Sequence, residues 1–191
     1  MIKLDVMRNK KLIFAILCTF LLIVFAYYYF VVYASYHEVD IHATYKSVAS
    51  FEELERNADV ILVGSAIPNT EKTVTTNFSN GNLQDIYTIT SFQVDKVIKQ
   101  PKDLTISDTF IFNQPGGTIQ TLTGKYRLKI EDYDNLKPEK TYIVYLGKNN
   151  SGGYSLMYSH NGRYALDDDN QEDNQHQNPL LKEAVLSKYK K

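Results

Sequence analysis

Four histidines are the side chains best suited to bind a metal or to transfer protons: His37, His42, His160 and His176. His37 and His42 are five positions apart, and neither a cysteine nor an HExxH motif accompanies them. Because a zinc site needs three or four converging ligands, we predict that these histidines hold no metal.

Ser159 and His160 are the candidate pair for nucleophilic catalysis, because they are adjacent in a segment of turn character. A hydrolytic centre also needs a third group that orients the base. A carboxylate such as Asp95 or Asp132 could serve if the fold brought it to His160. Since adjacency alone makes no triad, we predict no catalytic residue and no enzyme. A hydrolase of envelope substrates stays an alternative.

Two other segments resemble ligand-binding motifs in composition. Residues 167–178 (DDDNQEDNQHQN) offer the oxygen ligands that calcium prefers, but they lack the Gly and the terminal Glu of an EF-hand loop. Residues 114–117 (QPGG) are followed by neither Lys-Ser/Thr nor a helix start, as a phosphate-binding loop would require. We therefore predict an acidic linker and a turn, and no cofactor.

Charge is divided unevenly along the 191 residues. The net charge is −1. Residues 1–34 hold four Lys/Arg and one Asp, a net of +3, so the remaining 17 Lys/Arg and 21 Asp/Glu give residues 35–191 a net of −4. An acidic domain without a basic cluster argues against nucleic-acid partners, since phosphate binding needs clustered Lys and Arg.

The longest uncharged stretch runs from residue 12 to residue 32 (LIFAILCTFLLIVFAYYYFVV). Its 21 residues suffice to cross about 30 Å of hydrocarbon as a helix. Lys10 and Lys11 precede it, so the positive-inside rule places the N-terminus in the cytoplasm. Tyr27, Tyr28 and Tyr29 are typical of a membrane interface. We predict a single-pass protein of the cell membrane that contacts the membrane through residues 12–34, with the N-terminus in the cytoplasm and the C-terminal domain on the extracytoplasmic side.

A cleaved signal peptide is the alternative, with a cut after Ala34. Its hydrophobic core would exceed the usual 7–15 residues or so, which favours an uncleaved anchor. Cys18, the lone cysteine, lies inside the apolar stretch, so no disulfide can stabilise the outer part. Because animal secreted domains usually carry disulfides, this composition favours a bacterial exported domain.

The outer part is predicted to be mainly β. Ser50 and Glu53 form a capping box before a short helix over residues 51–58. A tight hairpin turn is expected at residues 161–162 and a loop over residues 68–82. The predicted strands cover residues 60–64, 86–98 with a bend or bulge, 104–113, 118–130, 141–146, 154–158 and 163–166.

We divide the chain into six parts. Asn178 and Pro179 are predicted to open a C-terminal helix. The parts are a cytoplasmic N-terminus (1–11), a membrane anchor (12–34), a connector (35–49), a β-rich extracytoplasmic domain (50–166), an acidic linker (167–178) and a C-terminal helix (179–191). Few strands, one of them long enough to bend, favour a small OB-like antiparallel barrel with flanking helices over a β-sandwich.

Several short motifs carry a family resemblance over residues 50–166: FEEL, ADVILVGSA, YTITSFQVDKVIK, ISDTFIFNQPGG, KPEKTYIVYLG and YSLMYSHNGRYAL. Their order resembles exported or membrane-anchored proteins of Gram-positive bacteria. More remotely, it resembles the netrin-like and metalloprotease-inhibitor modules, which are OB-like barrels. The resemblance implies the fold and supplies no catalytic residue. The inhibitors' zinc-binding N-terminal cysteine has no counterpart here.

These observations favour a membrane-tethered extracytoplasmic binding or scaffold module. Its partner would be a protein or a cell-envelope polymer, held by a barrel face or by the loops at residues 69–82 and 149–153. An inhibitor or regulator of another membrane or surface protein is a further alternative, with the aromatic-rich helix as its docking face.

Overall fold

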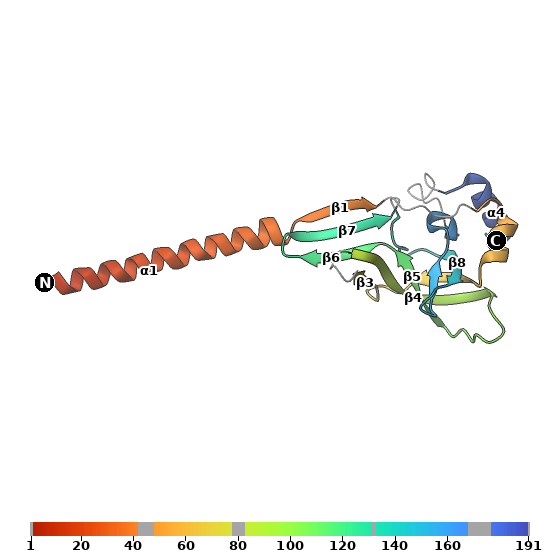
Figure 1. Cartoon of the computed structure of the whole chain (residues 1–191), viewed down its shortest axis with the longest axis horizontal. Helices are drawn as coiled ribbons and strands as arrows, with labels where there is room; N and C mark the ends of the chain where they lie inside the picture. Colours follow the sequence, from red (N-terminus) through yellow and green to blue (C-terminus); the bar gives the residue numbers. More distant parts are fainter. Residues whose placement is uncertain (1, 42–47, 78–82, 131–132, 168–176, 191) are drawn as a thin grey trace. The chain divides into compact units, whose positions relative to one another are not determined.

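A computed structural model describes residues 2–41, 48–77, 83–130, 133–167 and 177–190 (Figure 1). The chain forms two compact units. The first unit contains residues 1–39 and 118–127, and the second contains residues 40–117 and 128–191. The chain therefore leaves the second unit after Gly117 and returns to it at Leu128, a division that differs from the linear one expected above.

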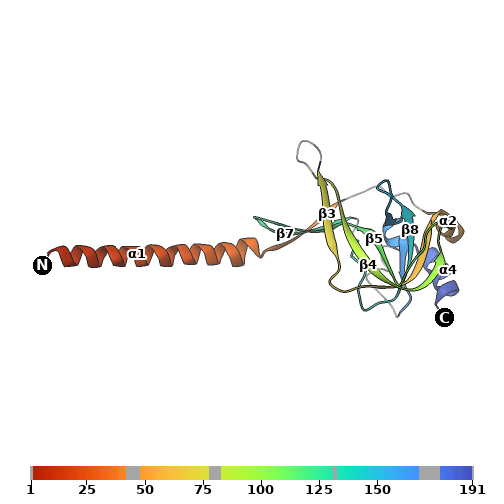
Figure 2. The same ribbon diagram turned by 90° about the horizontal axis from the view of Figure 1, so that it is seen from below.

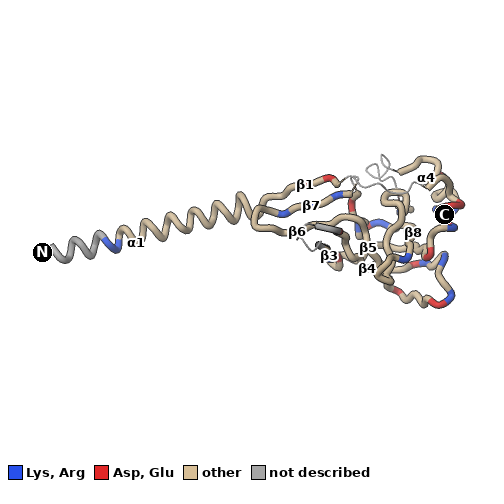
Figure 3. Tube along the Cα trace, viewed as in Figure 1, with Lys and Arg blue, Asp and Glu red and all other residues tan. Residues whose placement is uncertain are grey.

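The first unit begins with a long apolar helix. Helix α1 (Ile2–Tyr27) continues into a π-helical turn, η1 (Tyr28–Tyr33). Between Lys10 and Tyr33 this helix is long and apolar enough to cross a membrane. Its described charges lie near its N-terminal end (Figure 3). The rest of the unit comes from a three-stranded sheet in the order β1-β7-β6, with β1 (Tyr36–Ile41), β6 (Gly117–Thr121) and β7 (Gly124–Ile130).

The second unit contains a closed five-stranded barrel. Its strands are β2 (Val60–Ala66), β4 (Leu83–Lys99), β5 (Thr109–Pro115), β8 (Tyr142–Lys148) and β9 (Tyr154–Leu156). They pair in the order β8-β2-β4-β5-β9, and β9 pairs again with β8 to close the barrel. All of these pairs are antiparallel except β5–β9. The predicted OB-like barrel is confirmed.

Strand β4 is long because it pairs with two strands along one edge. Its first half pairs with β3 (Lys72–Asn77) and its second half with β2. The register against β2 shifts at Ile61/Leu62 and at Val63/Gly64, which confirms the expected irregularity in this long strand. Figure 2 shows β4 bending as it passes from one partner to the other.

The barrel buries side chains on both faces of β2 and β8. Val60 and Leu62 point inward with Val144 and Leu146, in the barrel core. The alternate residues pack outside it, under helices α2 (Phe51–Asn57) and α4 (Pro179–Tyr189). This second core contains Ile61, Ile143, Tyr145, Tyr164, Leu54, Ala58, Leu181 and Val185. Double burial explains why both strands read as continuous apolar runs.

Both flanking helices begin with the predicted caps. Ser50 Oγ accepts from Glu53 N at 3.2 Å, and Glu53 Oε2 accepts from Ala49 N at 2.9 Å. The Asn178 side chain accepts from Leu180 N at 3.0 Å. The two helices are joined where Lys188 Nζ lies 2.8 Å from Glu55 Oε2.

Four local expectations were wrong. The single extended stretch expected over residues 118–130 is a hairpin, in which a turn at residues 122–123 separates β6 from β7. The segment over residues 68–82, expected to be a loop, contains β3. The strand expected over residues 104–113 is β5, which begins at Thr109. The hairpin expected around residues 161–162 is absent, because a 3₁₀ turn, η2 (Ser159–Gly162), leads into β10 (Arg163–Ala165), which pairs with β8. The pairing with β8 places Tyr164 in the second core, where it is fully buried.

Candidate functional site

The residues singled out for hydrolysis do not form a catalytic centre in the described part of the chain. Ser159 and His160 are buried in η2, and the His160 ring lies 5.5 Å from the Tyr133 ring. The Arg163 guanidinium lies over the same Tyr133 ring, 4.3 Å from its centroid. Asp95 is exposed on β4, and Asp132 lies outside the described residues. His160 thus belongs to an aromatic and cationic packing cluster.

The remaining histidines and the acidic segment are placed differently. His37 stacks on Tyr126 at 4.9 Å, and its Nε2 lies 2.9 Å from Ser35 Oγ. His42, His176 and residues 168–176, the segment weighed for calcium, lie outside the described residues. Within the described ranges, no three His, Cys, Asp or Glu side chains converge as a metal site would require.

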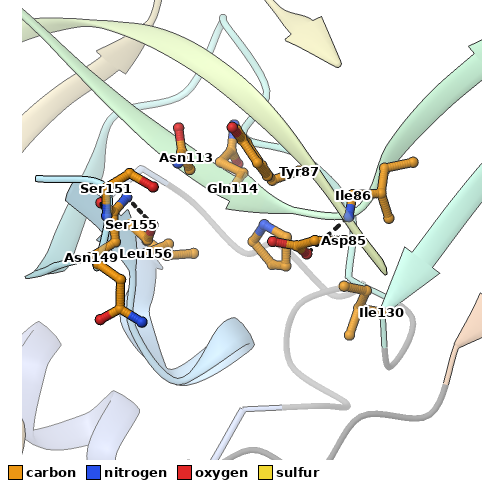
Figure 4. Close-up of a pocket in the computed structure, with 12 residues that line it drawn as sticks. Asp85, Ile86, Tyr87, Asn113, Gln114, Ile130, Asn149, Ser151, Ser155 and Leu156 are labelled. Carbon is orange, nitrogen blue, oxygen red and sulfur yellow. Dashed lines mark hydrogen bonds between the residues drawn. The ribbon is translucent and has the colours of Figure 1, made fainter. Parts of the chain in front are cut away.

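A cavity of about 330 Å³ opens on the barrel (Figure 4). One wall is the start of β4, with Asp85, Ile86 and Tyr87, and the next is the end of β5, with Asn113, Gln114 and Pro115. Opposite them lie the β8–β9 turn and β9, and Ile130 at the end of β7 completes the lining. In OB-like barrels, the face of the second and third strands and the loop between the fourth and fifth bind ligands. In this barrel these are β4, β5 and the β8–β9 turn.

The β8–β9 turn is ordered by one side chain. Asn149 Oδ1 accepts from Ser151 N at 3.1 Å and from Gly153 N at 2.9 Å. Its Nδ2 donates to Ser155 Oγ at 3.1 Å. These bonds fix the turn beside the cavity, and they account for the turn signal read in residues 149–153.

Buried hydrogen bonds support the β5 wall. Gln114 Oε1 accepts from Tyr133 Oη at 2.7 Å and from Leu136 N at 2.9 Å, and Gln114 Nε2 donates to Thr90 Oγ1 at 2.5 Å. Because Gln114 is 1% exposed and both its amide oxygen and its amide nitrogen are hydrogen-bonded, it holds the wall in place. Asn113, the preceding residue, is half-buried and lines the cavity.

The cavity lining is polar but nearly uncharged. Among the described residues that line it, Asp85 is the one charged residue, and Asp85 Oδ1 accepts from Ile86 N at 2.9 Å. The described part of the lining contains no Lys or Arg. Amides, hydroxyls and a phenol can donate to and accept from a ligand, while Ile86, Ile130 and Leu156 offer apolar contact. The site can therefore bind a neutral, hydrogen-bonding ligand, and it lacks the cations that an anionic ligand would need.

A second cavity of about 440 Å³ lies between the end of β2 and the segment before β8. It is lined by Ala66, Ile67, Asn69, Glu71, Leu136 and Pro138. Asn135 Nδ2 donates to Glu71 Oε2 at 3.0 Å beside it. It is lined by half as many described residues as the first cavity and lies away from the β4–β5 face, which makes it the weaker candidate.

Sequence reasoning found one side of the site and missed the rest. The β8–β9 turn was among the two candidate loops. Tyr87 and Asn113 were not identified, because each looks like an ordinary strand residue and the two meet only through the β4–β5 pairing. Comparison with protein-family models, with curated proteins and with solved structures finds no match for this chain.

Proposed function

We propose that the protein is a membrane-tethered, extracytoplasmic binding module, and that its barrel cavity takes a segment of a neutral envelope saccharide. The observation that carries the proposal is the cavity on the β4–β5 face, whose described residues offer amide, hydroxyl and phenol groups with one carboxylate, Asp85, and no Lys or Arg. Neutral saccharides present many hydroxyls to such groups, and their apolar ring faces pack on aromatic and aliphatic side chains.

The tether is supported by the N-terminal helix. Residues 10–33 are long and apolar enough to span a membrane. The adjacent Lys10 and Lys11 favour a cytoplasmic N-terminus. The acidic character of the outer part argues against nucleic acid as the partner.

The binding test uses the full chain in detergent and soluble N-acetylglucosamine oligomers as the probe, measured by calorimetry. We expect saturable binding that Asn113→Ala weakens by about 1 kcal/mol, roughly fivefold, because one neutral hydrogen bond is lost. Gln100→Ala is the control, since Gln100 is exposed and does not line the cavity. Absence of binding, or equal affinity for both variants, would reject a saccharide site in this cavity.

The topology test uses a C-terminal epitope tag and protease added to intact cells or spheroplasts. We expect a full-length protein whose tag is digested from outside. A protected tag would contradict the proposed orientation. A product shortened by the first 34 residues would instead mean that the segment is a cleaved signal and the domain is released.

A further inference from the structure

The tip of the β6–β7 hairpin is bonded to the end of the apolar helix within the first unit. Tyr28 Oη donates to the Leu122 carbonyl at 2.8 Å. Gln120 Nε2 donates to the Tyr33 carbonyl at 3.0 Å. After the helix, the Ser35 carbonyl accepts from Lys125 N at 2.8 Å. Contacts on both sides of the tip therefore hold it at the last turns of the helix.

A glycine permits this close approach. Gly124 has φ +135°, and a Cβ added there would lie 2.4 Å from Ser35 Oγ. Any other residue at this position would strain the backbone and push the hairpin away from the helix end. The glycine at position 124 therefore allows the hairpin to contact the chain at the end of the helix.

The tip is apolar at its outermost point and uncharged around it. Leu122 is 77% exposed, as exposed as any large apolar side chain of the described chain. No Asp, Glu, Lys or Arg occurs between Gly116 and Gly124. A single exposed leucine on a soluble surface needs no explanation. This one is different, because its own backbone carbonyl is bonded to a residue of the membrane-crossing helix.

The position of Tyr28 sets the depth of the tip. Counting about 20 residues from Leu12 puts the far boundary of the hydrocarbon near Val31. Tyr28 lies three residues before Val31, less than one helical turn inside that boundary. A loop bonded to Tyr28 therefore lies at the level where acyl chains meet headgroups, the depth at which interfacial elements bury their apolar side chains.

The flanking residues match this interface. Tyr29 stacks on Tyr33 with ring centroids 5.9 Å apart, and Tyr28 lies 6.4 Å from the same ring. Tyrosine rings favour the interface because their hydroxyls reach water. Lys125, the first charge after the tip, is exposed and can extend its ammonium toward the headgroups.

We propose that the β6–β7 hairpin is a second membrane contact, which inserts Leu122 into the interface of the same bilayer that α1 spans. The inference rests on the tether in the proposed function. It adds that the anchor has two parts, a helix and a hairpin tip. The tip would fix the rotation and height of the first unit at the membrane surface.

The experiment exploits the absence of tryptophan from the chain. Three single-tryptophan variants of the full chain are placed in phosphatidylcholine nanodiscs that contain brominated lipids: Leu122→Trp, Phe20→Trp in the middle of the span, and Ile111→Trp. Ile111 is 59% exposed on β5 and serves as the control outside the bilayer. We expect lipids brominated near the headgroups to quench Leu122→Trp several-fold more than Ile111→Trp. Deeply brominated lipids are expected to quench Phe20→Trp.

The outcomes separate the tip contact from the tether. Quenching of Phe20→Trp with Leu122→Trp no more quenched than Ile111→Trp keeps the tether and overturns the tip contact. Absence of quenching in Phe20→Trp overturns both. A nitroxide at position 122, in a Cys18→Ser, Leu122→Cys chain, gives a second readout. Its accessibility to oxygen should rise and its accessibility to a water-soluble nickel complex should fall in nanodiscs, and unchanged accessibility would reject the contact.

Discussion

At the residue scale, one buried amide supports the wall of the cavity. Gln114 is the shared partner of Tyr133, Leu136 and Thr90. We expect Gln114→Leu to lower the free energy of unfolding by about 2–4 kcal/mol, because each buried group left without its partner costs about 1–3 kcal/mol. Chemical denaturation of the full chain in detergent, followed by circular dichroism, measures the change.

Gln93→Leu is the matched control for that substitution. Gln93 is exposed on the neighbouring strand β4, so its replacement should change the free energy of unfolding by less than about 0.5 kcal/mol. Equal effects of the two substitutions would show that the Gln114 bonds make no special contribution to stability.

Two buried tyrosines link stability to alkaline pH. Burial raises the pKa of the Tyr145 and Tyr164 phenols above the ordinary value. Above about pH 10 the phenols of the unfolded chain release their protons, while the buried phenols of the folded chain keep theirs. The free energy of unfolding therefore has its full value below about pH 10 and decreases as the pH rises above it. We expect the free energy of unfolding to fall above about pH 10, and to fall less steeply in Tyr145→Phe.

The same substitution has a defined effect at neutral pH. No described residue forms a hydrogen bond with the Tyr145 hydroxyl. Removing a buried hydroxyl without a partner should leave the free energy of unfolding unchanged or raise it by about 1 kcal/mol. A loss of more than about 1 kcal/mol at pH 7 would mean that the hydroxyl has a stabilising partner.

At the element scale, helix α4 covers the outer face of the barrel through one row of side chains. Leu181 is 2% exposed and Leu180, its neighbour, is 77% exposed. We expect Leu181→Ala to lower the free energy of unfolding by about 2–5 kcal/mol, as buried leucines do when a cavity is created. Leu180→Ala should have an effect within about 0.5 kcal/mol, and similar losses for both would place α4 differently from the structure.

The elements that could be predicted from sequence are those whose local signals agree with their burial. Strand β8 was predicted because its residues are apolar on both faces, and α2 because its cap is encoded within four residues. Strand β3 (KTVTTN) was missed because its threonines resemble a polar loop. Its partner β4 begins only at Leu83, so the pairing leaves no signal within the segment itself. The pairing of β10 with β8 is likewise set by long-range contacts, which local turn signals do not report.

At the scale of the whole molecule, the small OB-like barrel could be anticipated from the sequence but the binding site could not. The cavity is assembled from the start of β4, the end of β5, the end of β7 and the β8–β9 turn. Each segment is unremarkable by itself, and only barrel closure through β5–β9 brings the β8–β9 turn opposite β4. The excursion of residues 118–127 into the first unit was also hidden, because an extended stretch gives no sign of its partner.

The division into two units predicts that the second one folds without the apolar helix. Both hydrophobic cores consist of residues between Val48 and Tyr189, and none of their members comes from the first unit. A fragment of residues 48–191 should therefore be soluble and unfold cooperatively. Its near-ultraviolet circular dichroism should keep the signal of the packed barrel aromatics and lose only the contribution of the tyrosines in the apolar helix. Leu122 would lose its helix contact in this fragment, so a polar residue there should reduce self-association without changing the unfolding midpoint. A fragment that keeps strand content but lacks near-ultraviolet signal would instead show that the barrel depends on the first unit for its packing.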